Sequence, residues 1–377
     1  MSTPSVARLA ALSLLGWASL ACADSSAPRT TAESPAELQL ERLWHVGGVD
    51  DTTLVFETLT RNDLAVDAQD RIFVIDRSAA RIAVLDSTGR LVDRWGTRGP
   101  GPGEFLFPLT LAVAPDGALH VYDAEKARIL VFASDGRFRD EHLRPAGHPF
   151  RFRFRSDTSV VGSTPPRIGG AMRLRAGAAP TWQTLDSVPA GPTGMIESVC
   201  GVVGHSVAPV FQPRLAWDAR GDTIVSSVGE FAITVRIPGA PDRVLIRDTS
   251  RRATDRSMAA RELGEGERFQ ILGRKPCLIP AAILLDVAHI APFMPAYTDL
   301  TLGTNRQLWA TRDGLSDEPA MADLFQLDSG YLSTVALGTA QPQAFLRSGV
   351  LLSIERDADD VPMIVAYRVS STTRTAR

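Results

Sequence analysis

One pattern of short apolar runs occurs twice between Leu64 and Arg139. Matched positions lie 47 residues apart without a gap, from Leu64 and Leu111 at the start to Gly89 and Gly136 near the end. A fixed period of this length is typical of a repeat architecture. Each copy holds three runs of four or five residues bounded by turn residues, which favours strands over helices. The alternative, two unrelated hairpins that align by chance, does not account for so long a gap-free match.

The turns inside each copy are those of antiparallel hairpins. Asp116-Gly117 is a strong hairpin signal, because Gly accepts a positive φ and Asp bonds to its own turn. A glycine also leads from the third run of each copy into a fourth, Arg90–Trp95 and Arg137–Leu143. Four antiparallel strands within such a repeat make one blade of a β-propeller.

Weaker versions of the pattern follow the two clear copies. They occupy, in order, Phe150–Leu185, Leu215–Ile246, Leu300–Leu332 and Gln343–Tyr367. The last of them lacks a fourth strand, and the alternating segment Leu38–Val46 is predicted to complete it, because this closes an open sheet edge. Thr53–Leu59 is a second candidate for this closing role. The expected fold is all-β: a six-bladed propeller of four-stranded antiparallel blades over residues 38–370.

The second copy carries a recognisable series of motifs. In order they are Gly99-Pro100-Gly101-Pro102-Gly103-Glu104-Phe105, Pro108, Leu111-Ala112-Val113, Asp116-Gly117, Val121-Tyr122-Asp123, Arg128-Ile129 and Val131-Phe132. This series resembles the NHL repeat, a family in which it marks blades of a six-bladed propeller. The resemblance covers two blades well. The whole chain resembles bacterial exported or lipid-anchored propeller proteins, a resemblance that implies the fold and no particular activity.

Residues 1–23 are predicted to be a signal peptide rather than part of the fold. Arg8 is the only charge, and the apolar run Leu9–Leu20 is too short for a permanent membrane span. Cleavage before Asp24 is one outcome. The other, which an isolated Cys22 at the end of the run favours, is a lipoprotein whose first mature residue is a lipidated Cys22. The protein is therefore expected in the periplasm or cell envelope, lipid-anchored, or otherwise secreted.

The composition of the remaining chain excludes some partners. Residues 24–37 are rich in Ser, Thr, Ala and Pro and are predicted to be a flexible tether, and residues 371–377 a disordered tail. The chain has 40 basic and 43 acidic residues and a net charge of −3, so nothing favours nucleic acid. We expect a monomer that meets a membrane only through the N-terminal lipid.

Residues 249–296 depart from the blade pattern. Thr249–Gly264 carries spaced apolar residues among charged ones, which predicts an amphipathic helix capped by Thr254 or Ser257. Four prolines interrupt the residues that follow. We expect a helical insertion between blades four and five. It is either a surface decoration or a lid or partner surface.

Two cysteines remain in the mature chain besides Cys22. An exported protein meets an oxidising compartment, so Cys200 and Cys277 are predicted to form a disulfide that joins the region before blade four to the insertion. The alternative is two separate buried thiols.

Catalytic and metal-binding patterns are weak. None of the six histidines has a spacing typical of a zinc site, so no metal and no cofactor are predicted. No Gly-x-Ser-x-Gly elbow is present. Asp76 and Asp123 recur at the same blade position with Arg81 and Arg128 five residues on, a repetition more typical of structural turns than of catalysis.

Phe150–Arg155 offers the best candidate ligand site. Phe and Arg alternate there, so Arg151, Arg153 and Arg155 share one side of a predicted strand. On an innermost strand these guanidinium groups would line the channel and favour an anionic ligand such as a carboxylate or an acidic sugar. On an outermost strand they would face solvent and carry no such meaning.

The leading functional hypothesis is an exported, non-catalytic binding module that recognises a protein, peptide or glycan through its top face or channel. It rests on the general use of propeller faces for recognition. A metal-dependent enzyme of the lactonase or lyase kind and a structural scaffold are the alternatives. We expect any site where the repeat breaks down: near Arg151–Arg155, near Cys200, and in residues 249–296.

Overall fold

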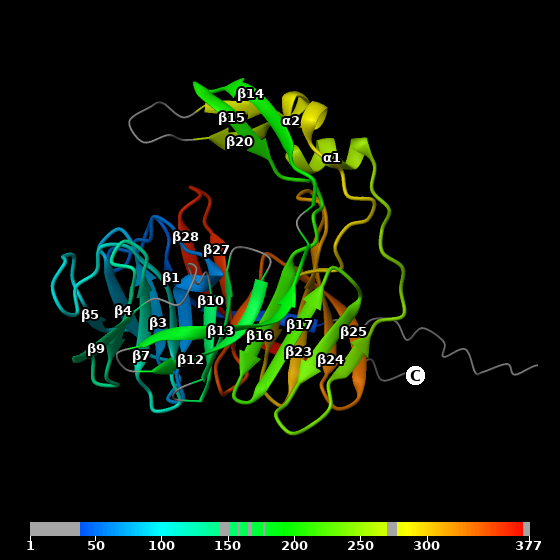
Figure 1. Ribbon diagram of the computed structural model, residues 1–377. Helices are drawn as coiled ribbons and strands as arrows, with labels where there is room; N and C mark the ends of the chain where they lie inside the picture. Colours follow the sequence, from blue (N-terminus) through cyan, green and yellow to red (C-terminus); the bar gives the residue numbers. More distant parts are fainter. Residues whose placement is uncertain are drawn as a thin grey trace, which may run out of the picture. The chain divides into compact units, whose positions relative to one another are not determined.

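The computed structural model describes residues 38–143, 151–156, 159–164, 168–175, 178–189, 191–269 and 277–371, all within one compact unit, Pro35–Arg377 (Figure 1). The predicted signal peptide, Cys22 and the predicted tether lie outside the described residues. So do residues 372–377. Ser371 belongs to the last strand, so the predicted tail began one residue too early.

Six four-stranded antiparallel sheets make up most of the described chain. The first three are β2 (Leu64–Val66), β3 (Ile72–Asp76), β4 (Arg81–Leu85) and β5 (Leu91–Trp95); β6 (Pro108–Val113), β7 (Leu119–Asp123), β8 (Arg128–Phe132) and β9 (Phe138–Leu143); β10 (Arg151–Ser156), β11 (Ser159–Thr164), β12 (Ile168–Arg175) and β13 (Ala178–Ser187). The next two are β16 (Leu215–Arg220), β17 (Thr223–Val228), β18 (Ala232–Arg236) and β19 (Arg243–Ile246); β22 (Tyr297–Leu302), β23 (Gln307–Arg312), β24 (Ala320–Gln326) and β25 (Gly330–Gly338). The last combines β26 (Pro342–Phe345), β27 (Leu351–Arg356) and β28 (Pro362–Ser371) with β1 (Leu38–Gly47).

The sheets are arranged as a β-propeller. The first strand of each sheet contacts the first strand of the next, in the order β2, β6, β10, β16, β22 and β26, and β26 contacts β2. We call these the innermost strands. β1 pairs antiparallel with β28, in the place predicted for the N-terminal strand. Thr53–Leu59, the second candidate for that place, forms no strand.

Packing between neighbouring sheets explains why the sequence shows continuous apolar runs. All five residues of β3 and all five of β7 are buried, because adjacent sheets cover both faces of these strands. Between the first two sheets, Phe73, Trp95 and Leu130 belong to one apolar cluster. The core is therefore a series of layers between sheets.

The repeated glycines are required by geometry. Gly89 and Gly136 have φ of 83° and 85°, a region that side chains with a Cβ rarely adopt. A Cβ at Gly89 would lie 2.5 Å from Trp44, and one at Gly136 would lie 2.5 Å from Trp95. Each glycine thus allows a tryptophan to cover its turn.

A small subdomain accompanies the propeller and is built from two segments of chain (Figure 1). It contains β14 (Gly194–Val199), β15 (Val202–Val207), α1 (Arg256–Leu263), β20 (Gly266–Phe269), β21 (Cys277–Pro280) and α2 (Ala281–Val287). Residues 249–296 therefore hold a hairpin as well as helices and are less helical than predicted. The predicted caps were wrong, because Asp255 is the N-cap of α1 and accepts from the backbone of Met258. Across the described residues, neither helix has the length and apolar character that crossing a membrane requires.

Candidate functional site

Two of the three predicted ligand-binding arginines lie at the centre of the propeller. Arg151 and Arg153 belong to β10, an innermost strand that contacts β6 and β16. This is the placement on which the binding hypothesis depended. Arg155 lies on the same strand, and its side chain is outside the described part of the chain.

The two arginines meet charged residues from other sheets. Arg151 Nη2 donates to Asp218 Oδ1 of β16 at 2.7 Å, and Arg151 Nη1 lies 3.5 Å from Asp299 Oδ1 of β22. Arg153 Nε lies 3.6 Å from Asp218 Oδ1. Arg61, in the short 3-10 helix η1 (Arg61–Asp63) before β2, pairs with Asp299. These five residues, the channel cluster, come from three sheets and from η1, and they meet where the innermost strands converge.

Burial controls the electrostatics of this cluster. It lowers the pKa of Arg61, Arg151 and Arg153, and the Asp218 carboxylate counteracts that effect in all three. Repulsion from Arg151 and Arg153 lowers the pKa of Arg61 further. With three arginines and two aspartates, the cluster carries one uncompensated positive charge.

Arg151 is held as part of the structure. Its Nη1 also donates to the backbone oxygen of Trp217 at 2.8 Å, and its guanidinium lies 4.9 Å from the Trp217 ring centroid. The side chain is 6% exposed. Arg151 therefore has little capacity for a ligand, and the predicted trio does not act as one set.

A cavity of about 190 Å³ lies at the ends of the innermost strands and is lined by residues from all six of them. Arg153 reaches it from β10, Arg220 from the end of β16, and Arg347 from the segment after β26. The side-chain oxygen of Gln343 is buried without a hydrogen-bond partner among the described residues. Gln343 also lines the cavity, so this acceptor can serve a ligand's donor group.

The guanidinium groups of two cavity arginines lack a carboxylate partner among the described residues. Arg220 Nη1 donates to the backbone oxygens of Leu302 and Gly303, and Arg347 Nη1 donates to that of Ala68. Both also line a neighbouring hollow of about 310 Å³. No charge pattern in the sequence marks either residue, and the two come together only when the ring of sheets closes.

The remaining predicted residues have mainly structural surroundings. Cys200 and Cys277 are joined as a disulfide in the structure, with Cα atoms 5.8 Å apart, and connect the two segments of the subdomain. Asp76 accepts from Arg81 Nε at 3.0 Å, whereas Asp123 accepts from the backbone of Leu106 at 2.7 Å. The described residues contain no group of three His, Cys, Asp or Glu side chains placed to hold a metal.

Comparison with known proteins supports the fold. A family described as a 6-bladed beta-propeller matches residues 58–146. No curated protein matches the chain. Among solved structures, a member of the DUF4221 family from Bacteroides vulgatus has a TM-score of 0.52 and 10% identity, over 90% of this chain and 100% of that one. A candidate exported protein from Bacteroides fragilis has a TM-score of 0.51 and 10% identity, over 90% and 97%. Identities this low show a shared propeller fold alone.

Proposed function

We propose that this protein is an exported, non-catalytic binding module, a six-bladed propeller closed by β1, whose channel mouth binds a carboxylate group of an acidic glycan. The described sheets and their successive contacts support the closed ring. The N-terminal pattern supports export and lipidation at Cys22. Mass spectrometry of the mature N-terminus tests this part: a diacylglyceryl Cys22 supports the anchor, and a free Asp24 contradicts it.

The observation that carries the binding proposal is the set of arginines at one cavity. The guanidinium groups of Arg220 and Arg347 lack carboxylate partners among the described residues, and Arg153 shares Asp218 with Arg151. The channel cluster, to which Arg153 and Asp218 belong, carries one uncompensated positive charge in total. An incoming carboxylate would offset this excess.

Guanidinium chemistry favours a carboxylate over a neutral ligand. The planar fork of Arg matches a carboxylate with two parallel hydrogen bonds. Such charge-assisted hydrogen bonds contribute about 1.5–3 kcal/mol each. The sugar hydroxyls of a glycan would then meet the free acceptor of Gln343, and the adjoining hollow leaves room for a second sugar.

Calorimetry with an acidic and a neutral oligosaccharide tests the proposal. We expect oligogalacturonate to bind and a maltooligosaccharide of equal length to bind at least tenfold more weakly. The double variant Arg220→Gln/Arg347→Gln should weaken oligogalacturonate binding by about 100-fold or more, because two charge-assisted contacts are lost.

Arg368→Gln is the matched control. Arg368 lies on β28, outside the linings of the cavity and the hollow, and its guanidinium already pairs with Glu41 at 2.6 Å. Its replacement should leave affinity within about twofold. Equal binding of both oligosaccharides, or unchanged affinity in the double variant, would overturn the proposal.

A further inference from the structure

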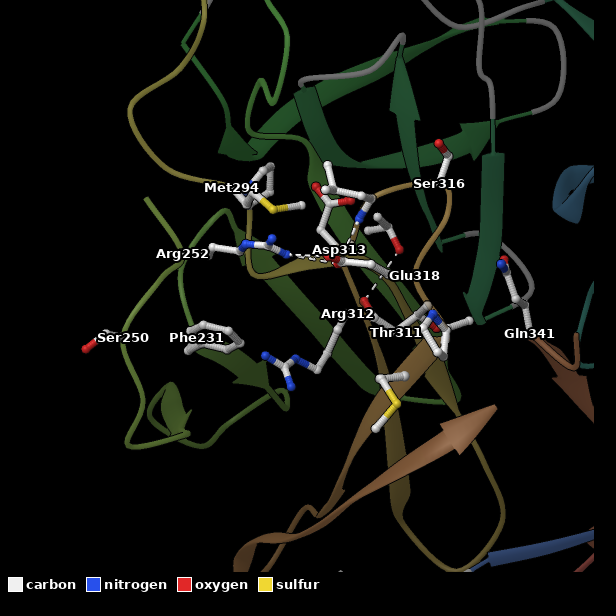
Figure 2. A pocket seen from close by; sticks show the side chains of 17 residues that line it. Phe231, Ser250, Arg252, Met294, Thr311, Arg312, Asp313, Ser316, Glu318 and Gln341 are labelled. Atoms are coloured by element: carbon white, nitrogen blue, oxygen red, sulfur yellow. Dashed lines mark hydrogen bonds and ion pairs between the residues drawn. The ribbon is translucent and has the colours of Figure 1, made fainter. Parts of the chain in front are cut away.

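A second and larger pocket, of about 470 Å³, lies between the propeller and the base of the subdomain (Figure 2). One wall is the loop between β23 and β24, residues 313–319. The opposite wall is the stalk, defined here as residues 249–255 and 291–296, which lead from β19 into the subdomain and back to β22. The size falls within the range of small-molecule sites.

Hydrogen bonds and ion pairs hold both walls in place. Within the stalk, Met294 N donates to Arg252 O at 2.9 Å, and Ala253 forms a β-bridge with Phe293. Across the pocket, Arg252 Nη1 lies 2.8 Å and 2.9 Å from the two carboxylate oxygens of Glu318 (Figure 2). The pocket is therefore a built feature, and these two charges neutralise each other.

Two other charged side chains line the pocket without such neutralisation. No hydrogen bond or ion pair within the described chain engages the guanidinium of Arg312, which lies 5.5 Å from the ring centroid of Phe231. Asp313 likewise has no ion-pair partner within 4 Å in that part of the chain. Its carboxyl receives a hydrogen bond from the backbone of Gly314. Burial raises the pKa of Asp313 to about 6, against the opposing effect of Arg214.

The two charges are directed to different parts of the pocket. Figure 2 shows Arg312 turned toward Phe231, whereas the Asp313 carboxyl lies on the side of Met294. A ligand that meets both must carry its own opposite charges some distance apart. A ligand with one charge would leave the other protein charge partly buried and unpaired, which is unfavourable.

Apolar side chains lie alongside these charges. Met294, Met321 and Pro295 line the pocket together with Phe231. Methionines adapt to irregular apolar groups, so this surface suits an aliphatic side chain. We propose that the junction pocket binds a short peptide with free ends, its carboxylate on Arg312, its ammonium on Asp313, and an aliphatic side chain against the methionines.

A dipeptide is a suitable probe for two separate charges of opposite sign. A single amino acid carries both charged groups on one carbon, whereas a dipeptide separates them by nearly two residues of extended chain, each spanning about 3.3 Å. Leucyl-leucine is the probe with matching chemistry.

Calorimetry of the mature full-length protein with leucyl-leucine tests the proposal at pH 7.5. We expect leucyl-leucine to bind, and N-acetyl-leucyl-leucine and leucyl-leucine amide each to bind at least tenfold more weakly. This comparison needs no substitution, so it does not depend on whether a variant folds. Arg312→Gln and Asp313→Asn should each weaken leucyl-leucine binding at least tenfold.

Arg368→Gln is the control, because Arg368 lies on β28 outside the pocket lining and pairs with Glu41 at the surface. It should leave affinity within about twofold, as should the channel variant Arg220→Gln/Arg347→Gln. Absence of leucyl-leucine binding, equal binding of the capped peptides, or loss of binding in the channel variant would overturn the assignment of a separate peptide site.

Discussion

Removing the negative charge of Asp218 tests the structural role of the channel cluster. Asp218→Asn keeps the size of the side chain and leaves a carbonyl oxygen to accept from Leu302 N, a contact of 2.8 Å. It removes the anion that lies 2.7 Å from Arg151 Nη2. Two charges about 4 Å apart interact by ~4 kcal/mol at an effective dielectric constant of about 20. The NH2 group of the asparagine then faces Arg151 Nη2, donor against donor, so no hydrogen bond replaces the lost ion pair. We expect the free energy of unfolding to fall by about 3–4 kcal/mol.

The excess of arginine predicts an asymmetry between the two partners. Asp218→Asn leaves three arginines with only Asp299, so repulsion among the guanidinium groups increases. Arg151→Met leaves two arginines and two aspartates, and Asp218 keeps Arg153 at 3.6 Å. An apolar replacement that restores neutrality should lower the free energy of unfolding by less than about 2 kcal/mol.

Urea unfolding followed by tryptophan fluorescence measures both effects. Asp242→Asn is the matched control, because Asp242 also pairs with an arginine, Arg236 Nε at 3.0 Å, and its side chain is 57% exposed. This substitution should lower the free energy of unfolding by less than about 1 kcal/mol. A loss of stability in Asp218→Asn no larger than in this control, or a larger loss in Arg151→Met, would contradict the charge excess in the cluster.

Three further predictions concern Asp313, Gly136 and the disulfide. The pKa of Asp313 in the folded protein, about 6, exceeds its usual 3.8, so stability should fall as pH rises between these values. Asp313→Asn should therefore raise the free energy of unfolding by about 1–2 kcal/mol at pH 7.5, a figure reduced because the carboxyl is partly exposed. At pH 4 the substitution should not stabilise the protein, and equal effects at both pH values would contradict this prediction. Gly136 has a φ of 85°, and an added Cβ would lie 2.5 Å from Trp95. Gly136→Ala should therefore lower the free energy of unfolding in urea by about 1–3 kcal/mol. The loss should exceed that of Gly221→Ala, where φ is 55° and a Cβ has open space. Cys277→Ser removes the disulfide between residues 77 apart and should lower the free energy of unfolding, measured by thermal unfolding, by up to about 4 kcal/mol. Non-reducing peptide mapping that finds both wild-type thiols free would contradict the disulfide.

The repeat region was predictable because its information is local. The run Ile72–Asp76, predicted from its apolar residues, is β3, and the turn glycine Gly136 has the positive φ that its turn requires. These features depend on a few neighbouring residues and on a period that the sequence displays openly. The subdomain was less predictable, because its two segments are separated by a whole sheet and become one unit only by packing together.

The propeller blades, and a strand on which Arg151 and Arg153 could face the channel, follow from local patterns of residues. The role of those arginines depends on the folded protein. Arg61, Asp218 and Asp299 come from distant parts of the chain, and no local pattern marks them as partners. Strand formation is set by neighbouring residues, whereas the neutralisation of a buried charge depends on which sheets converge. The same reason separates Arg151, whose charge is compensated, from Arg220, whose guanidinium has no carboxylate partner among the described residues.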